Sequence, residues 1–393
     1  MPWKNTDPEQ QRWQFLHEWL RRKIPLAALC RRCSISRKTA YKWLRRFTAQ
    51  GRAGLSDQPR VAQRVHNRPS RIWLARIRRW RARHPHWGVA KLHWALRRRF
   101  GRRALPSAAA MGRWLRRWGL TRTRRGRAAR AHVIARPALT TARRANEVWT
   151  VDFKGWFRTG DSTRIDPLTV RDLASRYVLA VVLLTRPTIV DCRAAFGRIF
   201  RAYGLPRIIR VDNGAPFGAD GALGLTRLSA WWVKLGIRVE FIAPGRPDQN
   251  GAHEQMHRVY KDETLQPAAP TRRAQQIRSE RWRRTYNEQR PHATIGMRVP
   301  AQLYRPSRRL MPARTPPWTY PHDWQSRLVK GKGMISLHGR TRFVGEAFEG
   351  ERVGLQAQRA GVYAIYYGPL LIGELHDQDP GGIRARWYRP RRR

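Results

Sequence analysis

Apolar residues in the first 50 positions recur at the three- and four-residue spacing of an amphipathic helix. These positions are Trp13, Leu16, Leu20, Ala40, Leu44 and Phe47. Residues 25–33 predict a short helix between the two groups, and Ser34 to Ser36 predict a turn and an N-cap. Three helices with a tight turn before a basic last helix favour a helix-turn-helix unit in residues 1–50, although a generic three-helix bundle has the same pattern.

A second helical pattern occupies residues 69–120. Its apolar positions are Ile72, Ala75, Ile77, Val89, Leu92, Leu96, Met111, Trp114 and Leu115. Arginines crowd the other faces, so the pattern predicts either a second helix-turn-helix-like module or a solvated basic bundle. Residues 121–146 have little periodicity and many arginines, which predicts a basic linker that lies on phosphates.

The pattern changes from helices to strands at about Val148, and residues 147–304 combine both. The predicted strands are 148–157, 168–172, 177–184, 208–211 and 237–242, and the predicted helices are 189–203, 228–235, 251–263 and 272–287. Three strands in succession, followed by alternating helices and strands, predict an α/β domain with a mixed sheet.

Short apolar runs separated by glycine turns fill residues 325–376, and a basic tail follows in residues 384–393. The runs are 329–335, 353–355, 362–367 and 371–375. They predict a small C-terminal β-barrel. We therefore expect a multidomain chain with an all-α helix-turn-helix arm, an α/β core and this barrel.

Charge changes the interpretation of residues 1–145, which we call the arm. The chain has 81 Lys and Arg against 26 Asp and Glu, a net charge of +55. Residues 1–145 hold 39 of the basic residues and only four of the acidic ones, a net charge of +35. Such a charge implies a polyanionic partner, and a predominance of Arg favours nucleic acid. In the third predicted helix, Arg37, Lys38, Tyr41 and Lys42 lie outside the apolar face, so we expect them to contact DNA.

Composition and cysteine content exclude several other classes. Hydrophobic residues make up 41% of the chain and include 18 Trp, which excludes a disordered basic tail. Membrane partners are not expected, because no uncharged apolar run approaches the length of a bilayer span and the N-terminus lacks a signal core. With three cysteines, a cytoplasmic, nucleoid-associated protein is expected. Cys30 and Cys33 form a C-x-x-C pair without a second pair, so we interpret them as packing residues.

Three carboxylates stand where they can converge on one edge of the predicted sheet. Asp152 lies in the first strand, Asp212 follows the strand 208–211, and Glu254 begins a helix after a stretch rich in breakers. An all-oxygen donor set suits Mg²⁺ or Mn²⁺, and two such ions support phosphodiester attack. Each residue also has an ordinary explanation, because Asp-Asn-Gly is a common turn and Asp152 has many arginines to pair with.

A family resemblance appears in five runs of residues 149–304: WTVDFKGWF, PLTVRDLASRYVLA, RAYGLPRIIRVDNGAPF, APGRPDQNGAHEQMHRVYKDET and YNEQRPH. They resemble the DDE transposases of bacterial insertion sequences, whose core is similar to retroviral integrase and has a ribonuclease-H-like fold. The arm, with HPHWGVAKL, matches that family in layout. The resemblance implies that Asp152, Asp212 and Glu254 are the metal-binding catalytic triad. The 41 residues between Asp212 and Glu254 exceed the interval in many relatives, and GADGALGL accommodates the excess.

The run His253-Glu-Gln-Met-His257 also has the H-E-x-x-H form of zinc metalloproteases. That chemistry needs a third ligand and a motif well inside a helix, whereas an Asn-Gly breaker puts Glu254 in the first turn. The protease reading therefore remains a remote alternative. Arg258 and Lys261 follow Glu254 on one helical stripe, where contact with a DNA backbone is expected.

Together these features predict a transposase that binds the terminal inverted repeats of a mobile element, cuts 3′ ends and joins them to target DNA with two Mg²⁺ or Mn²⁺ ions. Two element ends imply a homodimer or a higher oligomer on DNA. A DNA-binding regulator with an inert integrase-like core is the alternative.

Overall fold

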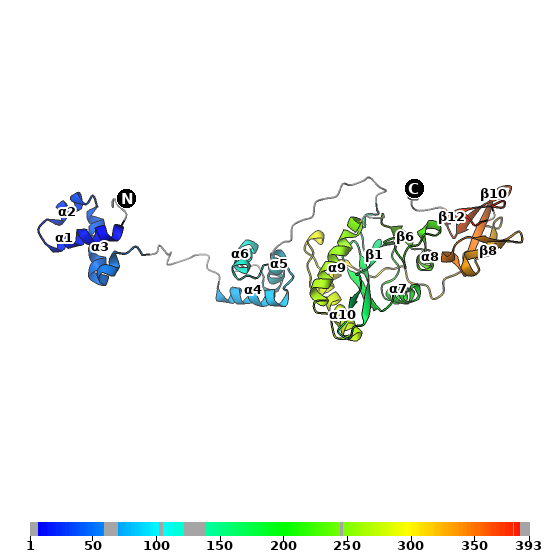
Figure 1. Cartoon of the computed structure of the whole chain (residues 1–393), viewed down its shortest axis with the longest axis horizontal. Coiled ribbons are helices and arrows are strands. Elements are labelled where there is room, and N and C mark those ends of the chain that lie inside the picture. The colour runs from blue at the N-terminus through cyan, green and yellow to red at the C-terminus, as the bar shows by residue number, and fades with distance from the viewer. Residues whose placement is uncertain are drawn as a thin grey trace. The chain divides into compact units, whose positions relative to one another are not determined.

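The computed structural model describes residues 7–58, 70–101, 105–121, 139–243, 247–379 and 381–385 (Figure 1). They fall into two compact units, Met1–Ser70 and Arg71–Arg393. Most of the predicted basic linker (122–138) and of the basic tail (386–393) lies outside the described residues. In the part of the chain that the structure describes, no helix is long and apolar enough to cross a membrane.

The first unit consists of helices α1 (Pro8–Leu20), α2 (Leu26–Arg32) and α3 (Arg37–Gln50), followed by a 3-10 turn, η1 (Gly51–Leu55). Asp7 caps α1, and the Ser36 hydroxyl caps α3 by accepting from the Thr39 amide at 3.1 Å. The buried core contains Phe15, Leu16, Leu29, Cys30, Ile35, Ala40, Trp43, Leu44 and Leu55. The predicted helix-turn-helix layout is confirmed, and Cys30 belongs to its apolar core.

A second group of helices consists of α4 (Arg71–Arg83), α5 (Val89–Phe100) and α6 (Ala108–Arg117). Their shared core contains Trp73, Ile77, Trp87, Leu92, Ala95, Leu96, Met111 and Leu115. Ser107 caps α6 as its sequence position predicts. Arg81 is buried among these helices, and its guanidinium donates there to the carbonyls of Pro85 and Trp87.

A mixed sheet forms the central layer of the predicted α/β core. Its strands are β1 (Val148–Phe153), β2 (Phe157–Arg158), β3 (Arg164–Asp172), β4 (Val178–Leu184), β5 (Ile208–Val211) and β6 (Arg238–Phe241). The order is β4-β3-β1-β5-β6, with β2 paired to β3. Strands β3 and β4 are antiparallel to their neighbours, and β5 and β6 continue parallel to β1. The single strand predicted over 148–157 is two strands, because Gly155 turns the chain with a φ of +83°.

Helices cover both faces of this sheet (Figure 1). One face packs on α7 (Ile189–Tyr203) and α8 (Arg227–Lys234) through Trp149, Val151 and the Phe196–Phe200 region. The other packs on α9 (Gly251–Thr264) and α10 (Arg272–Glu288). A short helix, α11 (Pro300–Leu303), follows. Since side chains alternate along a strand, Trp149 and Val151 face α7 while Thr150 and Asp152 face α9.

The C-terminal strands form two open sheets rather than the predicted closed barrel. Strands β7 (Gln325–Leu328), β10 (Arg352–Arg359), β11 (Val362–Tyr367), β12 (Leu370–His376) and β13 (Arg384–Ala385) form one sheet in the order β13-β12-β11-β10-β7. Strands β8 (Met334–Leu337) and β9 (Arg340–Phe343) form a separate pair. Short strands and glycine turns predict antiparallel pairing. A barrel closes only if its first and last strands also pair, and β7 and β13 lie at opposite edges of the sheet.

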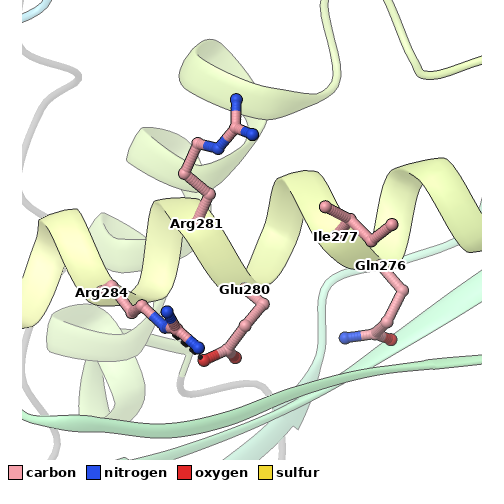
Figure 2. A pocket seen from close by; sticks show the side chains of 5 residues that line it. All are labelled: Gln276, Ile277, Glu280, Arg281 and Arg284. Atoms are coloured by element: carbon pink, nitrogen blue, oxygen red, sulfur yellow. Dashed lines mark hydrogen bonds and ion pairs between the residues drawn. The ribbon is translucent and has the colours of Figure 1, made fainter.

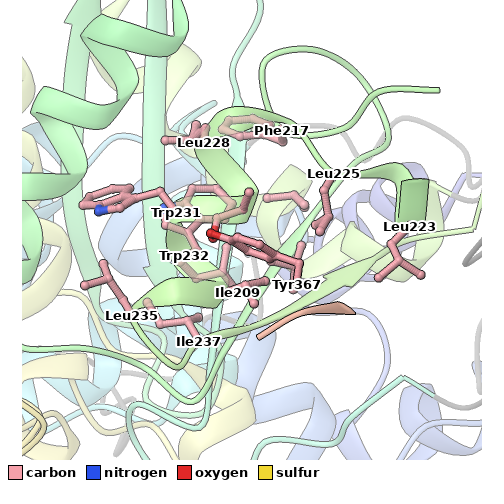
Figure 3. Packing of buried hydrophobic residues seen from close by; sticks show 14 of the residues in the cluster. Ile209, Phe217, Leu223, Leu225, Leu228, Trp231, Trp232, Leu235, Ile237 and Tyr367 are labelled. Atoms are coloured by element: carbon pink, nitrogen blue, oxygen red, sulfur yellow. The ribbon is translucent and has the colours of Figure 1, made fainter. Parts of the chain in front are cut away.

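This C-terminal sheet packs directly on the α/β core. The ring of Tyr367 enters the same apolar cluster as Trp231 and Trp232 (Figure 3). Its hydroxyl donates to the Ala230 carbonyl at 3.2 Å. Ion pairs from α8 surround the contact, with Lys234 bound to Glu351 at 2.5 Å and Arg227 bound to Glu349. The two parts therefore share one hydrophobic core.

Candidate active site

Asp152 and Asp212 lie on neighbouring parallel strands at the same level. The register pairs Val148 with Ile208 and Thr150 with Arg210, so two residues further along Asp152 comes beside Asp212. Adjacent strands are about 4.8 Å apart. Asp212 directly follows β5 and accepts a bond from the Gly214 amide at 3.3 Å, which closes the Asp-Asn-Gly turn. Asp212 therefore both closes an ordinary Asp-Asn-Gly turn and lies beside Asp152.

Glu254 lies in the first turn of α9, where the sequence predicts it. Helix α9 begins at Gly251, and Glu254 is exposed at its N-terminal end. His257, one turn later, approaches Asp152 with its Nδ1 3.9 Å from the Asp152 Oδ2. That contact fixes the start of α9 beside the end of β1. Arg258 and Lys261 are exposed on the same helix, as expected for a stripe beside Glu254.

The three carboxylates influence one another electrostatically. Burial first, and then the neighbouring charges of Asp212 and Glu254, raise the pKa of Asp152 to about 7 against the lowering effect of the Phe153 amide. Such crowding of like charges has no structural benefit for folding. It is a common feature of sites that hold cations or move protons.

The donor set fits a hard divalent cation. All three side chains offer carboxylate oxygens and no thiolate stands among them, which is the chemistry of Mg²⁺ and Mn²⁺ sites. The repulsion felt by Asp152 is the kind that a divalent cation would relieve. Across the described ranges, however, no group of three or more His, Cys, Asp or Glu side chains already has the arrangement of a metal cage.

The two histidines of the H-E-x-x-H run point into the sheet. His253 is fully buried, and its Nδ1 and Nε2 lie 2.8 Å from the Thr150 hydroxyl and 2.7 Å from the Thr169 hydroxyl. His257 Nε2 lies 2.7 Å from the same Thr169 hydroxyl. Burial lowers the pKa of both imidazoles, to about 3 for His257. With both ring nitrogens of His253 engaged by hydroxyls, the pair does not have the arrangement of zinc ligands.

Basic and aromatic groups that the sequence did not single out border the carboxylates. The pKa of Lys154, two residues after Asp152, is lowered by burial and by the charge of Lys261 on α9. Beyond the Gly155 turn, Trp156 is 57% exposed, and the guanidinium of Arg164 lies 5.2 Å from its ring. An exposed aromatic beside a candidate catalytic strand is the signal that sequence reasoning passed over.

The four DNA-contact candidates of α3 share one exposed face. Arg37, Lys38, Tyr41 and Lys42 are all exposed, whereas Ala40, Trp43 and Leu44 are buried. The Lys42 ammonium lies 4.6 Å from the Trp43 ring, which anchors its stem against the unit. This face therefore has the charge and the position of a recognition helix.

A hollow of about 530 Å³ on α10 lies apart from these groups (Figure 2). It is lined by Gln276, Ile277, Glu280, Arg281 and Arg284. Arg284 pairs with Glu280 at 3.3 Å along one side, and Ile277 is 57% exposed. None of the three carboxylates lines this hollow, so it does not belong to the candidate active site.

Known protein families match four stretches of the chain. Two families described as integrase core domains match residues 142–247 and 235–300. The C-terminal domain of the IS481 family transposases matches residues 324–377, and a homeodomain-like domain matches residues 6–56. These ranges contain the site described above, the C-terminal sheets and the first helical unit.

Individual relatives come from insertion elements. An uncharacterized 31.7 kDa protein of insertion element IS407 from Burkholderia multivorans is 29% identical over 181 residues, 46% of this chain and 63% of the relative. An uncharacterized 39.2 kDa protein of IS476 from Xanthomonas euvesicatoria is 30% identical over 192 residues, 46% of this chain and 51% of the relative. The chain thus spans 51% to 63% of the length of these two relatives. Among solved structures, the HTLV-2 integrase catalytic core domain in complex with magnesium is 16% identical, with a TM-score of 0.33 over 41% of this chain and 98% of that chain.

Proposed function

We propose that this chain, which matches integrase core domains and resembles proteins of insertion elements, is a transposase that binds the ends of a mobile DNA element, cuts their 3′ ends and joins them to target DNA. The observation that best supports this activity is the β1–β5 register, which brings Asp212 beside Asp152. Burial, and then the charges of Asp212 and Glu254, raise the pKa of Asp152. Crowded carboxylates at a sheet edge are suited to two divalent cations and thus to phosphodiester chemistry.

In this proposal Asp152, Asp212 and Glu254 would hold two Mg²⁺ or Mn²⁺ ions. Bound there, the ions would activate a water or a 3′-hydroxyl as the nucleophile and would stabilise the charge on the leaving oxygen. The strands β1 and β5 hold the two aspartates rigidly, and α9 brings the glutamate to them. No Ser, Cys or Tyr is required to form a covalent intermediate, because cleavage and joining are successive attacks by oxygen nucleophiles.

DNA binding is assigned to the basic surfaces outside the carboxylates. Arg37, Lys38, Tyr41 and Lys42 would read the terminal repeats from α3, and Arg258 and Lys261 would hold the strand near the reacting phosphate. The exposed ring of Trp156, with Arg158 and Arg164 beside it, offers a stacking surface for a nearby base. Two element ends call for at least two copies of the chain on DNA.

A cleavage and joining assay tests the proposal. The purified chain is incubated with duplex DNA carrying the inverted repeats that flank its gene, with Mg²⁺ or with a chelator. Nicked 3′ ends and joined products are expected only with the metal. DNA binding without any nicking, at several Mg²⁺ and Mn²⁺ concentrations, would instead support a regulator with an inert core.

A further inference from the structure

One buried hydroxyl joins the three elements that meet at the candidate active site. Thr169 lies on β3 and is fully buried. Its Oγ1 donates to the backbone carbonyl of Asp152 on β1 at 2.9 Å. The same oxygen lies 2.7 Å from the Nε2 of His253 and 2.7 Å from the Nε2 of His257, both on α9. A single side chain therefore contacts β1 at Asp152 and two successive turns of the helix that carries Glu254.

The chemistry of these groups determines where the protons lie. A hydroxyl has one proton and two lone pairs, and a carbonyl can only accept. The Thr169 proton therefore goes to the Asp152 carbonyl, and both imidazoles must donate their Nε2 protons to Thr169. The Nδ1 of His253 lies 2.8 Å from the Thr150 hydroxyl, so this imidazole is bonded to β3 on one side and to β1 on the other.

We propose that Thr169 is a positioning residue for the metal site: its hydroxyl sets α9 against β1 so that Glu254 meets Asp152 and Asp212. The inference rests on the proposed function and assigns a purpose to the two histidines of the H-E-x-x-H run. They are the helix side of a docking contact, and Glu254, which directly follows His253 in the first turn, stays exposed.

Other contacts support the same docking without replacing it. The Arg171 guanidinium, from the same strand as Thr169, donates to the Ala252 carbonyl in the first turn of α9. Beyond the docking contact, Met256 and Tyr260 of α9 pack on β3, β4 and α10, and the side chains of Tyr260 and Glu263 also hydrogen-bond to α10. Those polar contacts hold α9 against α10. The hydrogen bonds to Thr169 hold it against β3 and, through the Asp152 carbonyl, against β1, so they set the position of Glu254 relative to Asp152.

Direct metal binding tests the inference independently of catalysis. Thr169→Val keeps the shape of the side chain and removes the hydroxyl, and Thr169→Ser keeps the hydroxyl. Mn²⁺ binding to the purified full chain is measured from the loss of the electron paramagnetic resonance signal of free Mn²⁺. We expect Thr169→Val to weaken binding about tenfold, as the loss of groups that orient metal ligands does. We expect Thr169→Ser to bind within about twofold of the wild type. Amide hydrogen exchange in the first turn of α9 should become faster in the valine variant only.

Thr264→Val is the matched control. Thr264 is 2% exposed on the same helix, and its hydroxyl donates at 2.6 Å to the Tyr260 carbonyl within that helix. Thr264→Val makes the same Thr-to-Val replacement at a buried position of α9 that has no contact with β1, so Mn²⁺ affinity should not change. Wild-type affinity in Thr169→Val, or an equal loss in Thr169→Ser and Thr264→Val, would overturn the inference.

A second variant keeps the inference testable where Thr169→Val does not fold. Thr150→Val removes the hydroxyl that lies 2.8 Å from His253 Nδ1 and 3.4 Å from the Arg171 carbonyl, and it should weaken Mn²⁺ binding about threefold. Unchanged binding in a folded Thr150→Val protein would count against the docking role. Asp152→Asn separates this failure from failure of the proposed function. If Asp152→Asn binds Mn²⁺ like the wild type, the metal site itself is wrong. If it loses Mn²⁺ while the threonine variants do not, only the role of Thr169 is wrong.

Discussion

The first helical unit and the integrase core use arginine in opposite ways. In residues 1–145 the 39 basic residues far outnumber four acidic ones, so most arginines of the arm have no acidic neighbour in sequence to pair with. In the core, arginines are buried in ion pairs: Arg210 with Glu240 at 2.6 Å and Arg290 with Glu263 at 2.6 Å. Those two guanidinium side chains are each 6% exposed. The same residue type gives one region its excess positive charge and holds the fold in the other.

The few acidic residues of the arm make this contrast sharper. Asp7 caps α1, Glu9 accepts from the Ser56 hydroxyl, and Glu18 pairs with Arg32. Asp57 pairs with Arg12 at 2.9 Å. All four are committed to local structure, so the exposed cations of α3 keep their charge for a polyanion. The predictions below test this division between binding and structural charge, from the largest expected effect to the smallest.

Neutralising the candidate ligands should have the largest effect and should separate the two regions. Asp152→Asn, Asp212→Asn and Glu254→Gln are each expected to reduce strand cleavage by about a thousandfold, because metal binding requires the carboxylate charge. DNA affinity should change less than about twofold, because it comes from the basic surfaces. Asp323→Asn, an exposed site in the C-terminal part, is the control and should cleave normally. Substantial cleavage by one of the three variants would remove that residue from the site.

Arg12, like Arg81, is an arginine of residues 1–145 with a structural role. It is 6% exposed, donates to the Leu55 carbonyl at 2.6 Å and lies 4.0 Å from the Trp43 ring. Arg12→Ala should destabilise the first unit by about 2–4 kcal/mol, because it leaves a buried carbonyl without a donor and a void beside Trp43. Denaturant unfolding of the full chain, followed by Trp fluorescence, measures the loss. Arg21→Ala, at an exposed position of the same unit, should cost less than about 0.5 kcal/mol. Equal costs would show that burial does not distinguish the two arginines.

The exposed cations of α3 should behave as binding residues with little structural weight. Arg37→Ala and Lys38→Ala are each expected to weaken binding to the element ends about tenfold and binding to random duplex about twofold. Thermal unfolding should stay near that of the wild type, since both side chains are exposed. Fluorescence anisotropy with the two DNA sequences, at one salt concentration, makes the comparison. Equal losses on both sequences would assign these residues to phosphate contacts only.

The contact between the core and the C-terminal sheet should show the smallest effect. Tyr367→Phe keeps the buried ring and removes the hydroxyl that donates to the Ala230 carbonyl. The expected cost is about 1 kcal/mol, or a Tm lower by about 2–4 °C. Calorimetry of the full chain measures the shift. A second, separate transition for the C-terminal part would contradict the single shared core.

The local sequence pattern was sufficient to predict most helices and strands, but not where a strand breaks or whether a sheet closes into a barrel. Helix α3 and its Ser36 cap follow from residues within one turn of each other, so the sequence predicts them correctly. The strand predicted over 148–157 breaks at Gly155, whose left-handed backbone the alternation of side chains does not reveal. The barrel prediction was wrong for a related reason, because β7 and β13 are far apart in sequence and their pairing is a long-range choice.

The candidate site divides in the same way. Charge, order and strand placement were enough to nominate Asp152, Asp212 and Glu254, because carboxylates at strand ends and helix starts are visible in one dimension. Nothing in the sequence distinguishes His253 and His257 as sheet-facing residues from zinc ligands, since both readings need the same i, i+4 spacing. Thr169 carried no signal at all, because a threonine in a strand is ordinary until its hydroxyl is seen to meet β1 and α9. Sequence thus determined which charges exist and which elements bear them. Only the packing of α9 on the sheet decided which side chains stay exposed beside the carboxylates and which are buried against the strands, because that choice depends on contacts between residues about 80–100 positions apart.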